Sequence, residues 1–162
     1  MRIMGIDPGT ITAGYGVIEA DGDDIAPLCY NAIQCNGRSP IGERLSIIHA
    51  ELVKAIASHQ PDAIAVEHPF AAKNAKTALA IGKAQAVAIL AATNAGLPVF
   101  EYSPRQIKLR VTGYGGSSKE QVQETVRLQL DLEETPQPAD AADALAVAIC
   151  HTRELHLENL LS

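Results

Sequence analysis

The order of apolar and polar residues predicts an α/β chain. Apolar runs over residues 2–6, 13–20 and 27–35 are short and separated by turn residues, a pattern typical of three strands in an antiparallel meander. From residue 41 the apolar positions recur every three or four residues, which predicts a helix. The run over residues 63–66 predicts a fourth strand, and the helix before it favours parallel pairing for that strand.

The second half of the chain predicts helices around one further strand. Residues 73–94 form an alanine-rich helical stretch whose small side chains permit close approach, either to the sheet or to a second copy of the chain. A short strand at residues 99–100 and a helix over residues 104–111 follow. The second half of the chain thus adds a fifth strand, with one predicted helix before it and one after it.

Two serines compete for the start of the next helix. Ser118 with Gln121, or Ser117 with Glu120, has the spacing of a capping box, in which the serine side chain accepts a hydrogen bond from the backbone three residues on. The final helix begins near Ala139. Its alanine, leucine, valine and isoleucine residues are typical of a helix that lies flat on a sheet.

Length and composition fit a single domain over residues 1–162. Hydrophobic residues make up 47% of the chain and charged residues 20%, both ordinary for a soluble protein. No uninterrupted apolar run approaches the roughly 20 residues of a membrane span, and no signal-peptide pattern opens the chain. Cys29, Cys35 and Cys150 predict neither a disulfide framework nor a zinc site. We therefore expect a cytoplasmic protein with no membrane contact.

Charge is distributed unevenly along the chain. The net charge of −6 and the isoelectric point near 5.3 argue against a nucleic-acid-binding protein, whose usual sign is a basic footprint. Residues 71–127, however, hold eight Lys and Arg against three Asp and Glu. A local basic face can bind phosphates whatever the total charge, although a solvated helix surface explains the same lysines.

Four acids stand at positions that favour a shared site. Asp7 ends the first strand, because Pro8 after it cannot donate to a sheet, and Glu67 ends the fourth. Taken alone, Asp7 is slightly more typical of a turn residue. Asp140 and Asp143 share one face of the final apolar helix, where ionised carboxylates are costly unless they are paired or bind a metal. The four acids together predict a carboxylate cluster.

Such a cluster predicts the kind of metal and the kind of substrate. Oxygen ligands favour Mg²⁺ or Mn²⁺ over zinc. Several carboxylates around two ions about 3.5–4 Å apart form the arrangement that phosphoryl displacement needs, with one ion activating the attacking water and the other stabilising the leaving oxygen. The pattern therefore predicts a phosphodiester substrate, and the basic segment over residues 71–127 is suited to binding its phosphates.

Motifs that are specific in combination run through the chain in order. They are Met4 to Thr10, Gly14 to Gly16, Val66-Glu67 with Phe70, residues 72–75, Phe100 to Tyr102 with Arg105, Gln106 and Lys108, Gly113 with Lys119, residues 121–123, and Ala139 to Ala146. In this combination the chain resembles the RuvC family of Holliday-junction resolvases, the crossover junction endodeoxyribonucleases. The resemblance implies an RNase H-like α/β fold, a five-stranded mixed sheet flanked by helices on both sides.

The resemblance also implies an activity, partners and residue roles. It implies a homodimer that resolves four-way DNA junctions by symmetric nicking in recombination and repair, with a RuvA–RuvB branch-migration complex as partner. The catalytic metal ligands that it implies are Asp7, Glu67, Asp140 and Asp143. Lys108 and Lys119 match basic residues near the scissile phosphate, and Phe70 matches an aromatic residue that stacks on bases near the junction centre. The basic side chains expected to contact DNA are Lys73, Lys76, Lys83, Arg105, Lys108 and Lys119.

Alternatives remain open for several of these residues. Lys108 and Lys119 could be solvated, and Phe70 could fill the core. One motif departs from the family pattern: the family often has Gly-Gln-Ala-Arg-Gly on the long helix, where this chain has Gly82-Lys-Ala-Gln-Ala86. The missing arginine puts DNA affinity and helix packing in doubt, but not the metal site.

Two other functions share parts of the pattern. An actin- or sugar-kinase-like ATPase also has Asp-x-Gly-Thr after its first strand, but it needs two such domains around its nucleotide, and 162 residues provide one. A catalytically silent junction-binding module has no need of four acids, because carboxylates without a metal repel phosphate.

Overall fold

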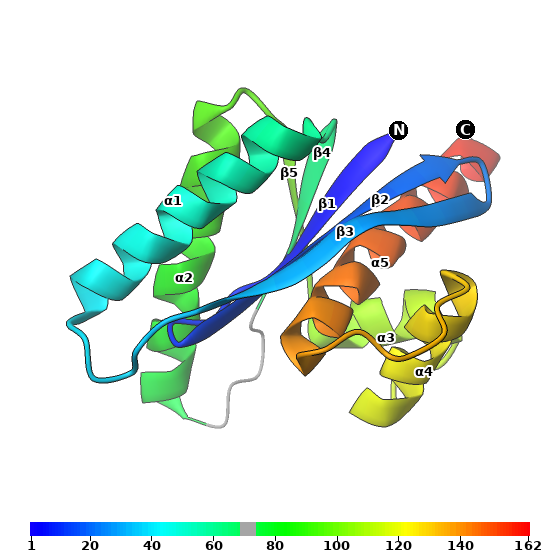
Figure 1. The fold of residues 1–162 in the computed structure, drawn as a ribbon. Coiled ribbons are helices and arrows are strands. Elements are labelled where there is room, and N and C mark those ends of the chain that lie inside the picture. The colour runs from blue at the N-terminus through cyan, green and yellow to red at the C-terminus, as the bar shows by residue number, and fades with distance from the viewer. Residues whose placement is uncertain (69–73) are drawn as a thin grey trace.

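The computed structural model describes residues 1–68 and 74–162. Its strands are β1 (Arg2–Asp7), β2 (Thr12–Asp21), β3 (Asp24–Gln34), β4 (Ala63–Glu67) and β5 (Val99–Tyr102). Its helices are α1 (Ile41–His59), α2 (Ala75–Asn94), α3 (Pro104–Thr112), α4 (Lys119–Gln129) and α5 (Ala139–Leu161). One sheet lies between two helical layers, with α1 and α2 on one face and α3, α4 and α5 on the other (Figure 1).

The central strand β1 sets the direction of the sheet. The strand order is β3-β2-β1-β4-β5, with β1 antiparallel to β2 and parallel to β4. Ile6 pairs with Val66 in the parallel ladder, so Asp7 and Glu67 follow at the same edge of the sheet. This arrangement confirms the predicted five-stranded mixed sheet, and it puts two acids at the carboxyl ends of neighbouring parallel strands, where open α/β sheets bind ligands.

Several strands extend beyond the ranges that the sequence pattern predicts, β3 and β5 among them. β3 begins at Asp24 rather than at residue 27, because Pro27 lies on an edge strand beside a register shift at Val17 and Ile18, where a missing N–H costs no ladder bond. β5 continues to Tyr102 because the ladder with β4 does not end before the pair of Glu67 and Tyr102.

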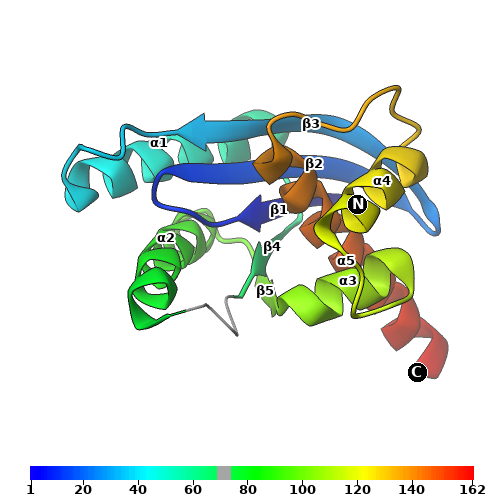
Figure 2. The ribbon, with the colours of Figure 1, turned by 90° about the horizontal axis from the view of Figure 1, so that it is seen from below.

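Helix α5 lies unusually close to the sheet. Eleven of the residues from Ala141 to Thr152 are buried, and five of them are alanine. A Cβ built on Gly5 of β1 would lie 2.0 Å from the carbonyl oxygen of Ala144, so only glycine permits this approach. The close packing holds the start of α5 against the end of β1 and the start of β2. Figure 2 shows α5 on the same side of the sheet as α3 and α4.

Helix α2 is apolar but largely uncovered. By length and composition alone it could cross a membrane, with a mean hydropathy of 1.3 over 18 residues. Polar residues such as Lys76, Lys83 and Gln85 interrupt the stretch, so it is not a continuous apolar run. Leu79 and Leu90 are 67% and 53% exposed, and only 28% of the 18-residue apolar stretch is buried, so the residues that the structure describes leave most of this helix surface uncovered.

Candidate active site

Carboxylates from three separate segments meet at the carboxyl edge of the sheet. Asp7, Asp140 and Asp143 each place a ligand oxygen within 4.8 Å of those of the other two. The side chain of Glu67, at the end of β4, shares a hydrogen bond with that of Asp7. The structure therefore brings together all four acids that the sequence singled out.

Burial and the crowding of negative charge raise pKa values within the acid cluster. Burial raises the pKa of Asp7 well above its ordinary value, and the charge of Glu67 and its hydrogen bond raise it further, followed by the charges of Asp143 and Asp140. Burial also raises the pKa of Asp143, although bonds from α4 oppose this effect. Oxygen ligands at this spacing, with too little positive charge around them, suit a divalent cation.

A pocket of about 310 Å³ opens beside the acids. Its lining residues come from the ends of β1 and β4 and from α3, α4 and α5: Asp7, Glu67, Pro104, Ile107, Lys108, Lys119, Val122, Asp143 and Ala146. The Nζ atom of Lys119 lies 3.0 Å from Oδ2 of Asp143, and this contact is the main cause of a raised pKa for Lys119. Two cationic side chains and three of the four acids thus share one hollow.

The start of α4 explains how Lys119 reaches the acids. Ser118 and Gln121 form a capping box, so Lys119 is the first residue of the helix. Ser117, the competing candidate, instead bonds through its hydroxyl to Thr112 and fixes the loop between α3 and α4. The structure decides between the two predicted capping boxes in favour of Ser118.

An ion pair holds α3 against α5. Nε of Arg110 lies 2.6 Å from Oε1 of Glu154, and its Nη2 lies 3.4 Å from Oε2, in a partly buried bidentate arrangement. A capping box of Ser103 and Gln106 closes the start of α3. Lys108, one turn further along, is therefore held on the wall of the acid pocket.

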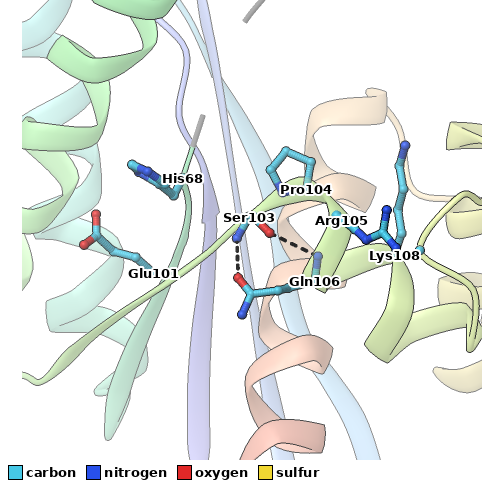
Figure 3. A pocket seen from close by; sticks show the side chains of 8 residues that line it. His68, Glu101, Ser103, Pro104, Arg105, Gln106 and Lys108 are labelled. Carbon is cyan, nitrogen blue, oxygen red and sulfur yellow. Dashed lines mark hydrogen bonds between the residues drawn. The ribbon is translucent and has the colours of Figure 1, made fainter. Parts of the chain in front are cut away.

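A larger pocket of about 640 Å³ adjoins the first, because Pro104 and Lys108 line both. Figure 3 shows His68 and Glu101 on one side of this pocket and Arg105 and Lys108 on the other. Arg105 and Lys108 form no ion pair with any residue that the structure describes. The basic side of the larger pocket therefore borders the acid cluster.

Gln85, which stands where the family motif often has arginine, contacts two residues that line the larger pocket, His68 and Glu101. Gln85 is buried, and its Nε2 atom donates to Oε1 of Glu101 at 2.5 Å and lies 3.3 Å from Nδ1 of His68. A neutral carboxamide thus links α2 to β5 and to the residue after Glu67. The departure from the family motif leaves the packing of α2 on the sheet intact.

The other predicted DNA-binding residues lie in different places. Lys76 lines a groove of about 470 Å³ between α2 and the turn after β1, and Asp140 lines the same groove. Lys83 lies on the outer apolar face of α2 and does not line the acid pocket. Phe70 and Lys73 lie outside the described residues.

Two features of the site escaped the sequence analysis. Gln123 hydrogen bonds the side chain of Asp143, and it follows Lys119 by four residues, so that both lie on one face of α4. The spacing of four residues between Lys119 and Gln123 indicates, from the sequence alone, that the two side chains share one face of the helix. The bond between Gln85 and Glu101 had no such signal, because it joins residues from a helix and a strand whose relative position depends on the whole fold.

Comparison with known proteins identifies the family. The model of "Crossover junction endodeoxyribonuclease RuvC" matches residues 3–151 of the chain. The chain belongs to the RuvC family. A RuvC of Dehalococcoides mccartyi is 57% identical over 162 residues, covering all of this chain and 97% of its own, and a RuvC of Desulfitobacterium hafniense is 45% identical over 98% of this chain and 96% of its own.

Solved structures agree with the RuvC assignment and with the fold. Thermus thermophilus RuvC, in complex with Holliday junction substrate, superposes with a TM-score of 0.92 at 34% identity, covering 98% of this chain and 96% of its own. The yeast mitochondrial Holliday junction resolvase superposes with a TM-score of 0.69 at 14% identity over 97% of this chain and 82% of its own. These likenesses confirm the RNase H-like fold, and the chain is a crossover junction endodeoxyribonuclease by family.

Proposed function

We propose that this chain resolves four-way DNA junctions by metal-dependent hydrolysis of a phosphodiester bond in each of two strands. The observation that carries the proposal is the convergence of Asp7, Glu67, Asp140 and Asp143 beside Lys108 and Lys119, in a chain that matches the RuvC family from end to end. Carboxylates suit the metal, and the two lysines suit the phosphate.

The four carboxylates are the proposed metal ligands. Their oxygens lie close together, and burial with mutual repulsion leaves the cluster short of positive charge. We propose Mg²⁺ or Mn²⁺, two ions per site, because hard oxygen ligands without sulfur or imidazole favour these ions. When bound, the ions supply an activated water and stabilise the leaving oxygen.

The proposed role of the basic residues is to hold the substrate strand. Lys108 lines both pockets, and Arg105 lies beside it in the larger one, so the backbone of a DNA strand can pass from one pocket to the other along α3. Lys119 lines the same acid pocket from α4. Two lysines around one phosphate orient it for in-line attack and reduce the charge that builds up on it.

The proposed homodimer forms through α2. Its outer face is a row of small and apolar side chains with a shallow hollow lined by Ala75, Ala78, Leu79, Gly82, Lys83 and Ala86. A Cβ built on Gly82 would meet no other atom of the described residues within 4 Å, so they leave this face open. A second copy packed on this face would bury an apolar surface that is costly in water, and a two-fold axis would supply one active site for each of two symmetric strands.

Two further expectations rest on the family resemblance. We propose RuvA–RuvB as the branch-migration partner of the enzyme, and the cytoplasm, where bacterial DNA is found, as its location. A pull-down of purified RuvA–RuvB with this chain on a junction, compared with the same mixture without DNA, tests the first of these.

The proposed activity is tested by its selectivity for DNA structure. The purified protein is incubated with Mg²⁺ and either a labelled four-way junction or a linear duplex of the same sequence. We expect paired nicks at symmetric positions in the junction and little cutting of the duplex. Equal cutting of the two substrates would contradict junction resolution while leaving a general nuclease.

A further inference from the structure

The Lys119 ammonium occupies the side of the acid cluster that faces solvent. Its Nζ lies 3.0 Å from Oδ2 of Asp143, whose side chain is 19% exposed, while the Lys119 side chain itself is 60% exposed. Asp7 and Asp140 are close enough to act on the same ammonium group, after Asp143 itself. One monovalent cation thus already sits among ligands that suit a divalent one.

We propose that Lys119 holds the place of a metal ion, so that Lys119 and the metal compete for Asp143. This inference rests on the proposed function, because it takes the acid cluster to be the metal site. When a divalent ion binds Asp143, the lysine loses its partner and is released at the pocket wall, where the scissile phosphate would lie. Metal binding would then prepare the site for substrate by freeing a cation.

Two structural features permit this exchange. Lys119 is the first residue of α4 and its long side chain is mostly exposed, so it can leave Asp143 without disturbing the helix. Gln123 donates a second, neutral hydrogen bond to the Asp143 carboxylate from the next turn of α4. Asp143 therefore remains oriented by Gln123 when the lysine departs.

Lys108 provides a matched control. It lines the same acid pocket, but it forms no ion pair with any residue that the structure describes. Lys119→Met and Lys108→Met each remove one positive charge near the same acids and keep a side chain of similar length. A long-range electrostatic effect would change metal affinity similarly in both variants, whereas direct competition would act in Lys119→Met alone.

The test is metal affinity in the absence of DNA. Binding of Mn²⁺ to the full-length protein is measured by the electron paramagnetic resonance signal of the free ion. We expect Lys119→Met to bind Mn²⁺ about tenfold more tightly than the unmodified protein and Lys108→Met to change affinity less than about threefold. Equal or weaker binding by Lys119→Met, or an equal gain in both variants, would overturn the inference.

Thermal melting gives a second, independent readout. In chelator, Lys119→Met should melt below the unmodified protein, because Asp143 has lost its counter-charge, and saturating Mn²⁺ should raise its melting temperature by more. An equal rise for both proteins would overturn the inference even where junction cutting is normal. Failure of the unmodified protein to bind any Mn²⁺ would instead overturn the proposed metal site, and this inference with it.

Discussion

Gly14 lies directly against the backbone of Asp140. A Cβ built on this glycine would lie 1.9 Å from the carbonyl oxygen of Asp140 and 2.5 Å from its carbonyl carbon. Gly14 also pairs with Asp7 across the ladder between β1 and β2. One glycine on β2 thus lets the first turn of α5 approach the end of β1, and the distance between Asp7 and Asp140 depends on it.

Gly14→Ala is therefore expected to move the start of α5 away from the sheet. Because backbone atoms rather than a flexible side chain oppose the new methyl group, we expect a loss of at least about 2 kcal/mol in the free energy of unfolding. Junction cutting by the folded variant should also fall, since two of the proposed metal ligands, Asp7 and Asp140, separate. Chemical denaturation and nicking rates measured on the same preparation check both effects.

Gly42→Ala is the matched control for that substitution. Gly42 is in the first turn of α1, and a Cβ there would meet no other atom within 4 Å in the part of the chain that the structure describes. Alanine at an open helical position should leave stability unchanged or raise it by about 0.5 kcal/mol. Similar losses for Gly14→Ala and Gly42→Ala would show that close approach to α5 is not the reason that Gly14 is glycine.

Repulsion among the ionised carboxylates of the acid cluster should lower the stability of the folded protein. Burial and neighbouring carboxylates raise the pKa of Asp7 above its ordinary value of 3.8, so the folded protein binds this proton more tightly than the unfolded chain does. Stability from this group is present at low pH and is lost as pH rises through the raised folded pKa. Asp7→Asn removes the charge, and in chelator it should melt a few degrees above the unmodified protein.

The pH dependence of that difference is the decisive part of the measurement. Melting temperatures are measured between about pH 5 and pH 8 in the presence of a metal chelator. The difference in melting temperature between Asp7→Asn and the unmodified protein should grow with pH, because only the unmodified protein must ionise Asp7. A variant that is less stable at every pH would contradict the account of the cluster as a repulsive one.

Some parts of this site follow from local sequence, and others do not. Asp7 and Glu67 were predictable because a strand end is marked by neighbouring residues, and the pair of Asp140 and Asp143 by helical spacing. The ion pair between Lys119 and Asp143 was not, because the angle at which α4 meets α5 depends on packing between segments more than twenty residues apart. The fold class was predictable from the alternation of elements, whereas the full length of each strand depended on its partner.

The uncovered face of α2 should determine oligomeric state. Leu79→Glu puts a charge at the centre of the exposed apolar row, and we expect it to convert a dimer into a monomer at micromolar concentration. Sedimentation velocity measures the change. Leu128→Glu is the control, because Leu128 is similarly exposed, at 61%, but lies on α4. A dimer that survives Leu79→Glu would place the interface elsewhere.

The contribution of a lysine to junction cutting should depend on its position and not on its charge alone. Lys119 contacts the acid cluster, whereas Lys54 on α1 is 72% exposed and pairs only with Glu51 among the residues that the structure describes. Each substitution by alanine removes one positive charge. We expect Lys119→Ala to slow junction cutting by at least about tenfold and Lys54→Ala by less than twofold, or about 0.4 kcal/mol. Equal losses in the single-turnover nicking rates of Lys119→Ala and Lys54→Ala would contradict a role of Lys119 that depends on its place beside the acid cluster.

The central claim is that four acids from three segments form one metal-dependent active site. It is tested most directly by nicking of a labelled four-way junction in Mg²⁺ by the unmodified protein and by Asp7→Asn, with circular dichroism to confirm that the variant is folded. We predict paired symmetric nicks by the unmodified protein and a loss of at least about a hundredfold in rate for the folded variant. Undiminished nicking by folded Asp7→Asn would contradict the claim.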